Sequence, residues 1–234
     1  MKIAILSDIH GNIDALNEVL KIIEKENIKT IFSLGDQLGY YYDAEQVYRE
    51  LRNRNSYIIN GNHERIFLDY LNYEDLAIDE KYGICFKYYK NNFNFELINY
   101  IKKLPKFLNV KINNINFSLF HGSSFDEDFY VYPSENRKIL DRFSKSDSDI
   151  IFFGHSHYPF MFNAGNKTVI NVGSVGQSRV VGGIANWGVF DTTNMVFVPK
   201  STPYNVKNVI QKIKEIDKGK YLETILKRNN MHYE

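Results

Sequence analysis

The sequence predicts a mixed α/β protein in which two β-sheets pack together and helices flank them. Near the start of the chain, short apolar runs at residues 2–6, 30–34 and 57–59 alternate with segments of helical periodicity, which is typical of parallel strands joined by crossover helices. From residue 107 onward, apolar runs follow one another with a single helical segment between them. A chain of 234 residues is long enough to bury the core that two packed layers need.

The early helices are predicted from the spacing of their apolar residues. The segment after the first strand repeats them at the intervals of one helix face, namely at Ile13, Leu16, Val19, Leu20 and Ile23. Residues 43–54 have a helix-like pattern between the second and third strands. Each early strand is therefore followed by a helix that returns along the sheet.

The later apolar runs predict strands that pair partly antiparallel. They occupy residues 107–112, 115–120, 150–153, 159–163, 168–172, 187–191 and 196–199. Asn113-Asn114, Gly165-Asn166 and Thr193-Asn194 separate neighbouring runs at hairpin distances. Residues 134–144 predict the helix between them. Residues 206–216 predict a last helix whose apolar face covers a sheet or forms a dimer contact.

One aromatic-rich segment stands apart from this alternation. Residues 67–103 have a helical pattern and many rings, and we predict a small helical insertion there. It could cap a functional site, or its rings could fill the insertion's own core. Because no repeat or low-complexity linker is visible, we expect residues 1–234 to form a single domain.

Composition excludes several classes of partner. Lys plus Arg number 29 against 28 Asp plus Glu, a formal net charge of +1, so the chain lacks the overall basic field that holds long nucleic acid. The one cysteine, Cys85, cannot form an internal disulfide or a thiolate metal cluster. No apolar run is long enough for a signal peptide or membrane span. We expect a cytoplasmic monomer or homodimer with no membrane partner.

Metal-ligand side chains follow the predicted strands. Of six histidines, all except His232 lie in short polar segments directly after strands: His10, His63, His121, His155 and His157. Asp8 and Asp36 lie in the same kind of segment. One histidine after a strand is usually a surface or structural residue, but loops at the carboxyl ends of parallel strands converge. The sequence therefore predicts one cluster of imidazoles and carboxylates, which are ligands for divalent metal ions.

These segments resemble a known family. Five motifs, Asp8-Ile9-His10, Gly35-Asp36, Gly61-Asn62-His63-Glu64, His121-Gly122 and Gly154-His155-Ser156-His157, occur in the order found in the calcineurin-like metallophosphoesterase superfamily. Residues 171–179 also resemble a segment of its small bacterial and archaeal single-domain members. The resemblance implies a four-layer αββα sandwich and a phosphodiesterase type of activity.

The resemblance also implies a dinuclear site. Asp8, His10 and His157 would hold one metal ion, Asn62, His121 and His155 the other, and Asp36 would bridge them. Oxygen and imidazole ligands without thiolate lead us to expect Mn first, then Fe, then Zn. Such a site hydrolyses phosphate esters by metal-bound hydroxide. His63, the family's histidine that is not a ligand, is expected to contact the phosphoryl oxygens and protonate the leaving group.

The expected substrate is a small phosphorylated molecule, such as a nucleotide, with a phosphodiester or phosphoanhydride bond. Arg179 suits a second phosphate, and the rings of Phe125 and Tyr130 could stack on a base. Asn62 and His63 would contact the phosphoryl group. The segment Gln37-Leu38-Gly39-Tyr40 lacks the Asp-Arg-Gly run of the protein phosphatase branch. The alternatives are a phosphomonoesterase with the same site, a non-catalytic protein-binding scaffold, and a nuclease, which the net charge disfavours.

Overall fold

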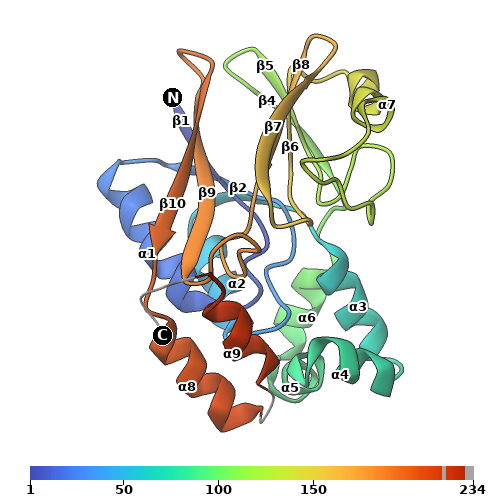
Figure 1. Ribbon diagram of the computed structural model, residues 1–234, viewed down its shortest axis with the longest axis vertical. Coiled ribbons are helices and arrows are strands. Elements are labelled where there is room, and N and C mark those ends of the chain that lie inside the picture. Colours follow the sequence, from blue (N-terminus) through green and yellow to red (C-terminus); the bar gives the residue numbers. More distant parts are fainter. Residues whose placement is uncertain (218–219, 230–234) are drawn as a thin grey trace.

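A computed structural model of the chain describes residues 1–217 and 220–229, and its strands form two five-stranded sheets (Figure 1). The strand order of the first sheet is β10 (Val196–Pro203), β9 (Ile184–Asp191), β1 (Lys2–Leu6), β2 (Thr30–Ser33) and β3 (Asn55–Ile58). The order of the second is β4 (Leu108–Ile112), β5 (Ile115–Leu119), β6 (Ile150–Phe153), β8 (Lys167–Val172) and β7 (Pro159–Ala164).

Both sheets are mixed, as the sequence predicts. In the first, β1, β2 and β3 are parallel, and β9 runs antiparallel to both β1 and β10. In the second, β5, β6 and β8 are parallel, and the hairpins β4–β5 and β7–β8 add an antiparallel strand at each edge. Within each sheet, the loops that leave the parallel strands emerge at the same edge.

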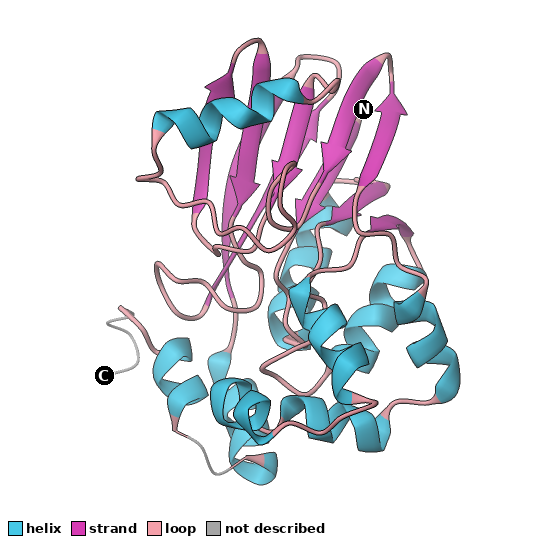
Figure 2. Cartoon of the chain, turned by 90° about the vertical axis from the view of Figure 1, so that its right-hand side faces the viewer, coloured by secondary structure: helices cyan, strands magenta, loops and turns pink. Residues whose placement is uncertain are grey.

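Helices flank both sheets, which confirms the predicted fold class. The core over one face of the first sheet includes residues of α1 (Ile13–Lys25), α2 (Ala44–Arg52), α8 (Val206–Ile216) and α9 (Tyr221–Leu226). A short helix, α7 (Arg137–Leu140), continues as a 3₁₀ helix (Asp141–Lys145) against the far face of the second sheet. Figure 2 shows most of the helices gathered at one end of the strands. Among the described residues, no helix is long and apolar enough to cross a membrane.

The predicted helical insertion lies between β3 and β4. It consists of α3 (Asn62–Tyr70), α4 (Leu76–Tyr82), α5 (Cys85–Asn92) and α6 (Phe95–Lys102). It begins earlier than the predicted residue 67 because the Glu64 carboxylate accepts the backbone N–H of Gly61, the residue before α3, at 2.6 Å and so stabilises the first turn. Its buried rings belong to the same core as α1 and α2. The insertion is therefore packed onto the body of the protein.

Strand β1 is apolar on both faces, because both of its faces are buried. Ile3 and Ile5 lie in the core between the two sheets, whereas Ala4 and Leu6 lie in the core under the helices. At the centre of the core between the sheets, the ring of Phe152 lies 6.2 Å from that of Phe117, centroid to centroid. This packing holds the strand ends, and hence the loops after them, in fixed positions.

Several predicted elements have other bounds in the structure. β9 begins three residues before the strand predicted at 187–191, and β10 ends four residues after the strand predicted at 196–199, because the two strands pair along their whole length. The helix expected over residues 134–144 is reduced to α7 and the 3₁₀ helix, in which only Leu140 and Phe143 are buried, so little apolar surface supports a longer helix. The third strand covers Asn55–Ile58 instead of residues 57–59, because it pairs in parallel with the whole of β2.

Replacing Phe152 with Ala should lower the free energy of unfolding by about 3–5 kcal/mol, because it leaves a cavity between the sheets. Phe107→Ala is the matched control, since the Phe107 residue is 54% exposed and its loss should cost about 0.5 kcal/mol or less. Urea unfolding of the two variants measures both values. Equal effects would contradict the described core.

Candidate metal centre

The loops after four strands and the first turn of α3 bring eight polar side chains together. They are Asp8 and His10 after β1, Asp36 after β2, Asn62 and His63 in α3, His121 after β5, and His155 and His157 after β6. All except Asn62 are buried. Within three groups, possible ligand atoms lie within 4.8 Å of one another: Asp8, His10 and His157; His10, Asp36 and His63; and Asp36, His121 and His155. Every residue predicted as a metal ligand is therefore in this cluster.

The first group presents two imidazole nitrogens to each other. Nδ1 of His10 lies 3.2 Å from the carbonyl oxygen of Leu38, and Nδ1 of His157 lies 2.7 Å from that of Gln177. A carbonyl only accepts, so each Nδ1 carries a proton, and in the neutral form of each ring Nε2 presents a lone pair. The two Nε2 atoms are 3.0 Å apart, and Oδ1 of Asp8 is 3.2 Å from Nε2 of His157. Three acceptors this close together fit a shared metal ion.

The second group is built in the same way around His121. Its Nδ1 donates to the carbonyl oxygen of Leu34 at 2.8 Å. Its Nε2 then lies 2.9 Å from Oδ1 of Asn62 and 3.3 Å from Oδ2 of Asp36. His155 completes the group, with its ring centroid 4.7 Å from that of His121. Two oxygens and two imidazoles are again a suitable donor set for a divalent ion.

Asp36 lies between the two groups. Its Oδ2 is 3.3 Å from Nε2 of His121, 3.8 Å from Nε2 of His10 and 3.9 Å from Nε2 of His63. Its Oδ1 accepts the backbone N–H of His63 at 2.9 Å, which fixes the orientation of the carboxylate. One oxygen is thus held by the backbone, and the other faces both ligand sets.

Burial and the neighbouring charges set the protonation of the cluster. Burial opposes the ionisation of Asp36, but the imidazoles of His121 and His63 outweigh it and hold the pKa of Asp36 well below its usual range. Burial also opposes a charge on His121, but the carboxylate of Asp36 raises the pKa of His121 to about 9. Burial lowers the pKa of His63 to about 4 and that of His155 to about 3. A metal ion would therefore displace a proton from His121, while His63 and His155 are already neutral at pH 7.

Five of the clustered residues have a left-handed backbone. The φ angle is 53° at Asp8, 54° at His10, 55° at Asp36, 66° at His155 and 61° at His157. Such a conformation costs a residue other than glycine about 1–3 kcal/mol and persists where the surroundings enforce it. The strand-end loops thus carry strain at the positions that present their side chains to the centre.

Glu64 clamps the loop that carries Asp36. One carboxylate oxygen accepts the backbone N–H groups of Asp36 and Gly61 at 2.9 and 2.6 Å. The other accepts the N–H of Gln37 at 2.8 Å and the hydroxyl of Tyr48 at 2.9 Å. A Glu three residues after an N-cap can accept the N–H of that N-cap, so the spacing of Gly61 and Glu64 was the available signal. The bonds to the Asp36 loop depend on tertiary structure.

Aromatic side chains surround His63. Its ring centroid lies 4.8 Å from that of Tyr40, 4.9 Å from that of Tyr82 and 5.7 Å from that of Phe86. Its Nδ1 is buried and has no hydrogen-bond partner among the described residues. Tyr82 comes from the insertion, where the sequence does not distinguish it from the other rings. Sequence reasoning therefore missed this contact.

Of the residues predicted to contact substrate, Tyr130 and Arg179 lie beside the centre. The Tyr130 ring covers His155, with a centroid separation of 3.7 Å. Burial raises the pKa of Tyr130 to about 12 and raises that of Tyr40 further, and the nearby guanidinium of Arg179 opposes both shifts. The charge of Arg179 therefore acts on both phenols.

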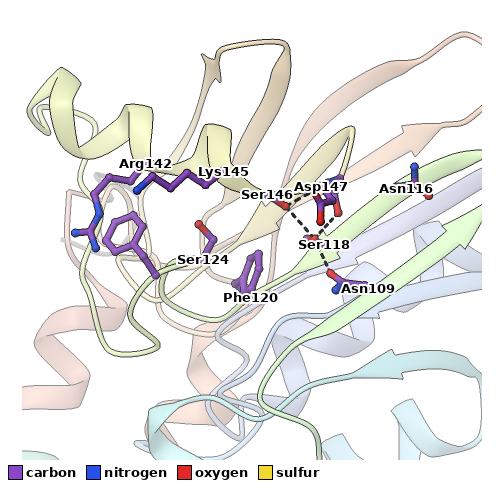
Figure 3. Close-up of a pocket in the computed structure, with 11 residues that line it drawn as sticks. Asn109, Asn116, Ser118, Phe120, Ser124, Arg142, Lys145, Ser146 and Asp147 are labelled. Carbon is purple, nitrogen blue, oxygen red and sulfur yellow. Dashed lines mark hydrogen bonds between the residues drawn. The ribbon is translucent and has the colours of Figure 1, made fainter.

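Phe125 is placed differently from the prediction. Its ring packs against Phe129 and Phe143, with the guanidinium of Arg142 3.6 Å from its centroid. It lines a pocket of about 510 Å³ on the far face of the second sheet, together with Ser118 and other polar residues (Figure 3). Because the side chain turns into the core under the 3₁₀ helix, the structure does not bring this ring to the histidine cluster.

Comparisons with known proteins find relatives that match most of the chain. The family model described as the calcineurin-like phosphoesterase superfamily domain matches residues 1–195. The chain is 31% identical over 229 residues to the uncharacterized protein MJ0912 of Methanocaldococcus jannaschii, covering 90% of this chain and 91% of that one. It is 25% identical over 197 residues to phosphodiesterase MJ0936 of the same organism, covering 82% and 93%. A metallophosphoesterase structure from Sphaerobacter thermophilus has a TM-score of 0.82 at 23% identity, covering 97% and 98%.

Replacing Glu64 with Gln should lower the free energy of unfolding by about 2–4 kcal/mol. Both carboxylate oxygens now accept hydrogen bonds from buried N–H groups, and in the variant an amide NH₂ group, which cannot accept, would replace one of these oxygens. Tyr48→Phe removes a single donor to the same carboxylate and should cost about 1 kcal/mol. Chemical denaturation of both variants measures the difference. A loss below about 0.5 kcal/mol in Glu64→Gln would contradict the clamp.

Proposed function

The chain belongs to the calcineurin-like phosphoesterase superfamily, and from this premise we propose that it hydrolyses phosphodiester or phosphoanhydride bonds of small nucleotide-like substrates with the help of two divalent metal ions. That it is a metallophosphoesterase follows from the family and from its phosphodiesterase relative. The observation that supports the two-ion proposal is the position of Asp36, whose Oδ2 lies within 3.8 Å of imidazole nitrogens from both ligand sets.

The proposed ligands divide around Asp36. Asp8, His10 and His157 would hold one ion, and Asn62, His121 and His155 the other. When bound, two such ions supply positive charge that orients a phosphoryl group and lowers the pKa of a water molecule. The chain itself supplies two carboxylates that are anionic in the buried site and imidazoles oriented by backbone carbonyls.

The donor set favours a borderline divalent ion. All proposed ligand atoms are oxygen or imidazole nitrogen, and the thiol of Cys85 is buried in the helical core. Because no thiolate is available to select Zn, we expect Mn first, then Fe, then Zn.

His63 is the proposed acid. It lies beside Asp36, its Nδ1 has no hydrogen-bond partner in the described part of the chain, and burial holds its pKa at about 4. A phosphoryl anion next to the ring would oppose this shift and raise the pKa. His63 would then donate a hydrogen bond to the phosphoryl oxygens and a proton to the departing oxygen.

Arg179, Tyr130 and Asn62 are the other proposed substrate contacts. The guanidinium of Arg179 suits a second phosphate group, because its planar fork can donate two parallel hydrogen bonds. The Tyr130 ring, over His155, is 38% exposed and offers a surface on which a base could stack.

The purified chain should bind about two Mn²⁺ ions and hydrolyse bis-p-nitrophenyl phosphate in their presence. Asp36→Asn should lower this activity by more than about 100-fold and weaken metal binding, because it removes the shared charge. Asp69→Asn, on the exposed side of α3, is the control and should match the wild type. Metal analysis and steady-state assays test this, and absence of both bound metal and Mn-dependent activity would contradict the proposal.

The acid role of His63 predicts a dependence on the leaving group. For a diester that releases an alkoxide, His63→Gln should lower kcat/KM by about 10²–10⁴-fold, because the departing oxygen needs a proton. For bis-p-nitrophenyl phosphate the loss should be much smaller, because p-nitrophenolate leaves without one. The measurement is kcat/KM for both substrates in both proteins. An equal loss on both would assign His63 to binding alone.

A further inference from the structure

Three tyrosine rings and one guanidinium lie around the histidine cluster. Tyr40 is in the loop after β2, Tyr82 ends α4, Tyr130 is in the loop after β5, and Arg179 is in the loop after β8. Tyr40, Tyr82 and Tyr130 are called the tyrosine rim below. The Tyr40 ring packs against the Tyr82 ring and against His63, and the Tyr130 ring packs against His155. The charge of Arg179 acts on both Tyr40 and Tyr130. Four distant segments therefore meet over the centre.

The rim has two sides. Tyr40 and Tyr82 lie on the His63 side, with centroids 4.8 and 4.9 Å from that imidazole and 5.9 Å from each other. Tyr130 lies on the opposite side, against His155. Because His63 is the proposed acid, the departing oxygen of a substrate must lie next to it. The group attached to that oxygen then lies next to Tyr40 and Tyr82.

The insertion places Tyr82 at this point. The α4 helix ends at Tyr82, and the next residue, Gly83, has a left-handed backbone with φ of 72°, which stops the helix as glycine commonly does. The Tyr82 ring packs against Phe86 at 5.6 Å, so α4 and α5 hold it in place. The aromatic-rich insertion thus contributes a side chain to the site in addition to filling its own core.

The side chains of the tyrosine rim are aromatic and nearly uncharged. Burial raises the pKa of Tyr40 and of Tyr130, so these phenols are neutral at pH 7, and Arg179 carries the nearby positive charge. Neutral rings favour a planar aromatic group by stacking. They offer little to a short alkyl group.

We propose that Tyr40 and Tyr82 form a binding wall for the leaving group, so that the enzyme selects substrates whose departing alcohol is a nucleoside or another aromatic group. This inference rests on the proposed function. In the reaction, the phosphorus bond to the nucleoside 5′ oxygen breaks and a bond from phosphorus to the oxygen of water forms. The 5′ oxygen takes a proton from His63, the attacking water releases one proton to solvent, and His63 regains its proton from solvent after the products leave. Tyr82 is a specificity-determining residue in this scheme.

The methyl ester of adenosine 5′-monophosphate tests the proposed binding wall, because one phosphorus atom carries both an aromatic leaving group, adenosine, and a small one, methanol. Hydrolysis releases either adenosine and methyl phosphate or methanol and adenosine monophosphate, so chromatography of the products gives a partition ratio. This ratio does not depend on the fraction of folded or metal-loaded enzyme. We expect the wild type to release mainly adenosine. Tyr82→Ala should lower the ratio of adenosine to methanol release by about tenfold, which corresponds to about 1.4 kcal/mol.

Two further variants control the experiment. Tyr82→Phe keeps the ring and should keep the wild-type ratio. Tyr73→Ala removes an 83% exposed tyrosine from the same insertion and should also leave the ratio unchanged. An unchanged ratio of adenosine to methanol release in Tyr82→Ala would contradict the proposed binding wall. Cleavage of bis-p-nitrophenyl phosphate without cleavage of the methyl ester would also contradict it. Failure to cleave either substrate with Mn²⁺ would instead overturn the proposed function.

Discussion

The close approach of buried acceptors around Asp36 is the constraint on which the site depends. Two carboxylates and five imidazoles lie in a region from which water is largely excluded, and three of the rings donate their Nδ1 proton to backbone carbonyls. Their Nε2 atoms consequently face other acceptors. Burying such a set without a compensating cation is unfavourable. The arrangement therefore makes physical sense as a metal centre and poor sense as a structural hydrogen-bond network.

The rest of the fold serves to hold these acceptors at short range. The parallel strands bring the loops of each sheet to a common edge, and the aromatic core between the sheets keeps the strand ends from moving. Glu64 joins the Asp36 loop to the first turn of α3 through backbone N–H groups. These interactions hold the left-handed residues in place and offset their strain.

The fold class and the clustering of the eight polar side chains were predictable because both depend on local patterns. Apolar runs ending in Asp8-Ile9-His10 or Gly35-Asp36 identify strand ends, and the convergence of such ends is a general property of parallel sheets. The left-handed backbone at His155 and His157 was not predictable, because it is imposed by contacts between segments distant in sequence. The same reason explains Phe125, whose ring is turned into the core by Phe143, and Tyr82, which reaches the site through the packing of the insertion.

The groups that orient three of the imidazoles are backbone carbonyls, those of Leu34, Leu38 and Gln177. Many metal-binding histidines are oriented by a carboxylate side chain, which one mutation can remove. Here a substitution at these three positions changes the side chain and keeps the carbonyl. Homologues can therefore diverge at such sites while preserving the tautomer of these three imidazoles, so sequence drift around the cluster need not alter the orientation of these rings.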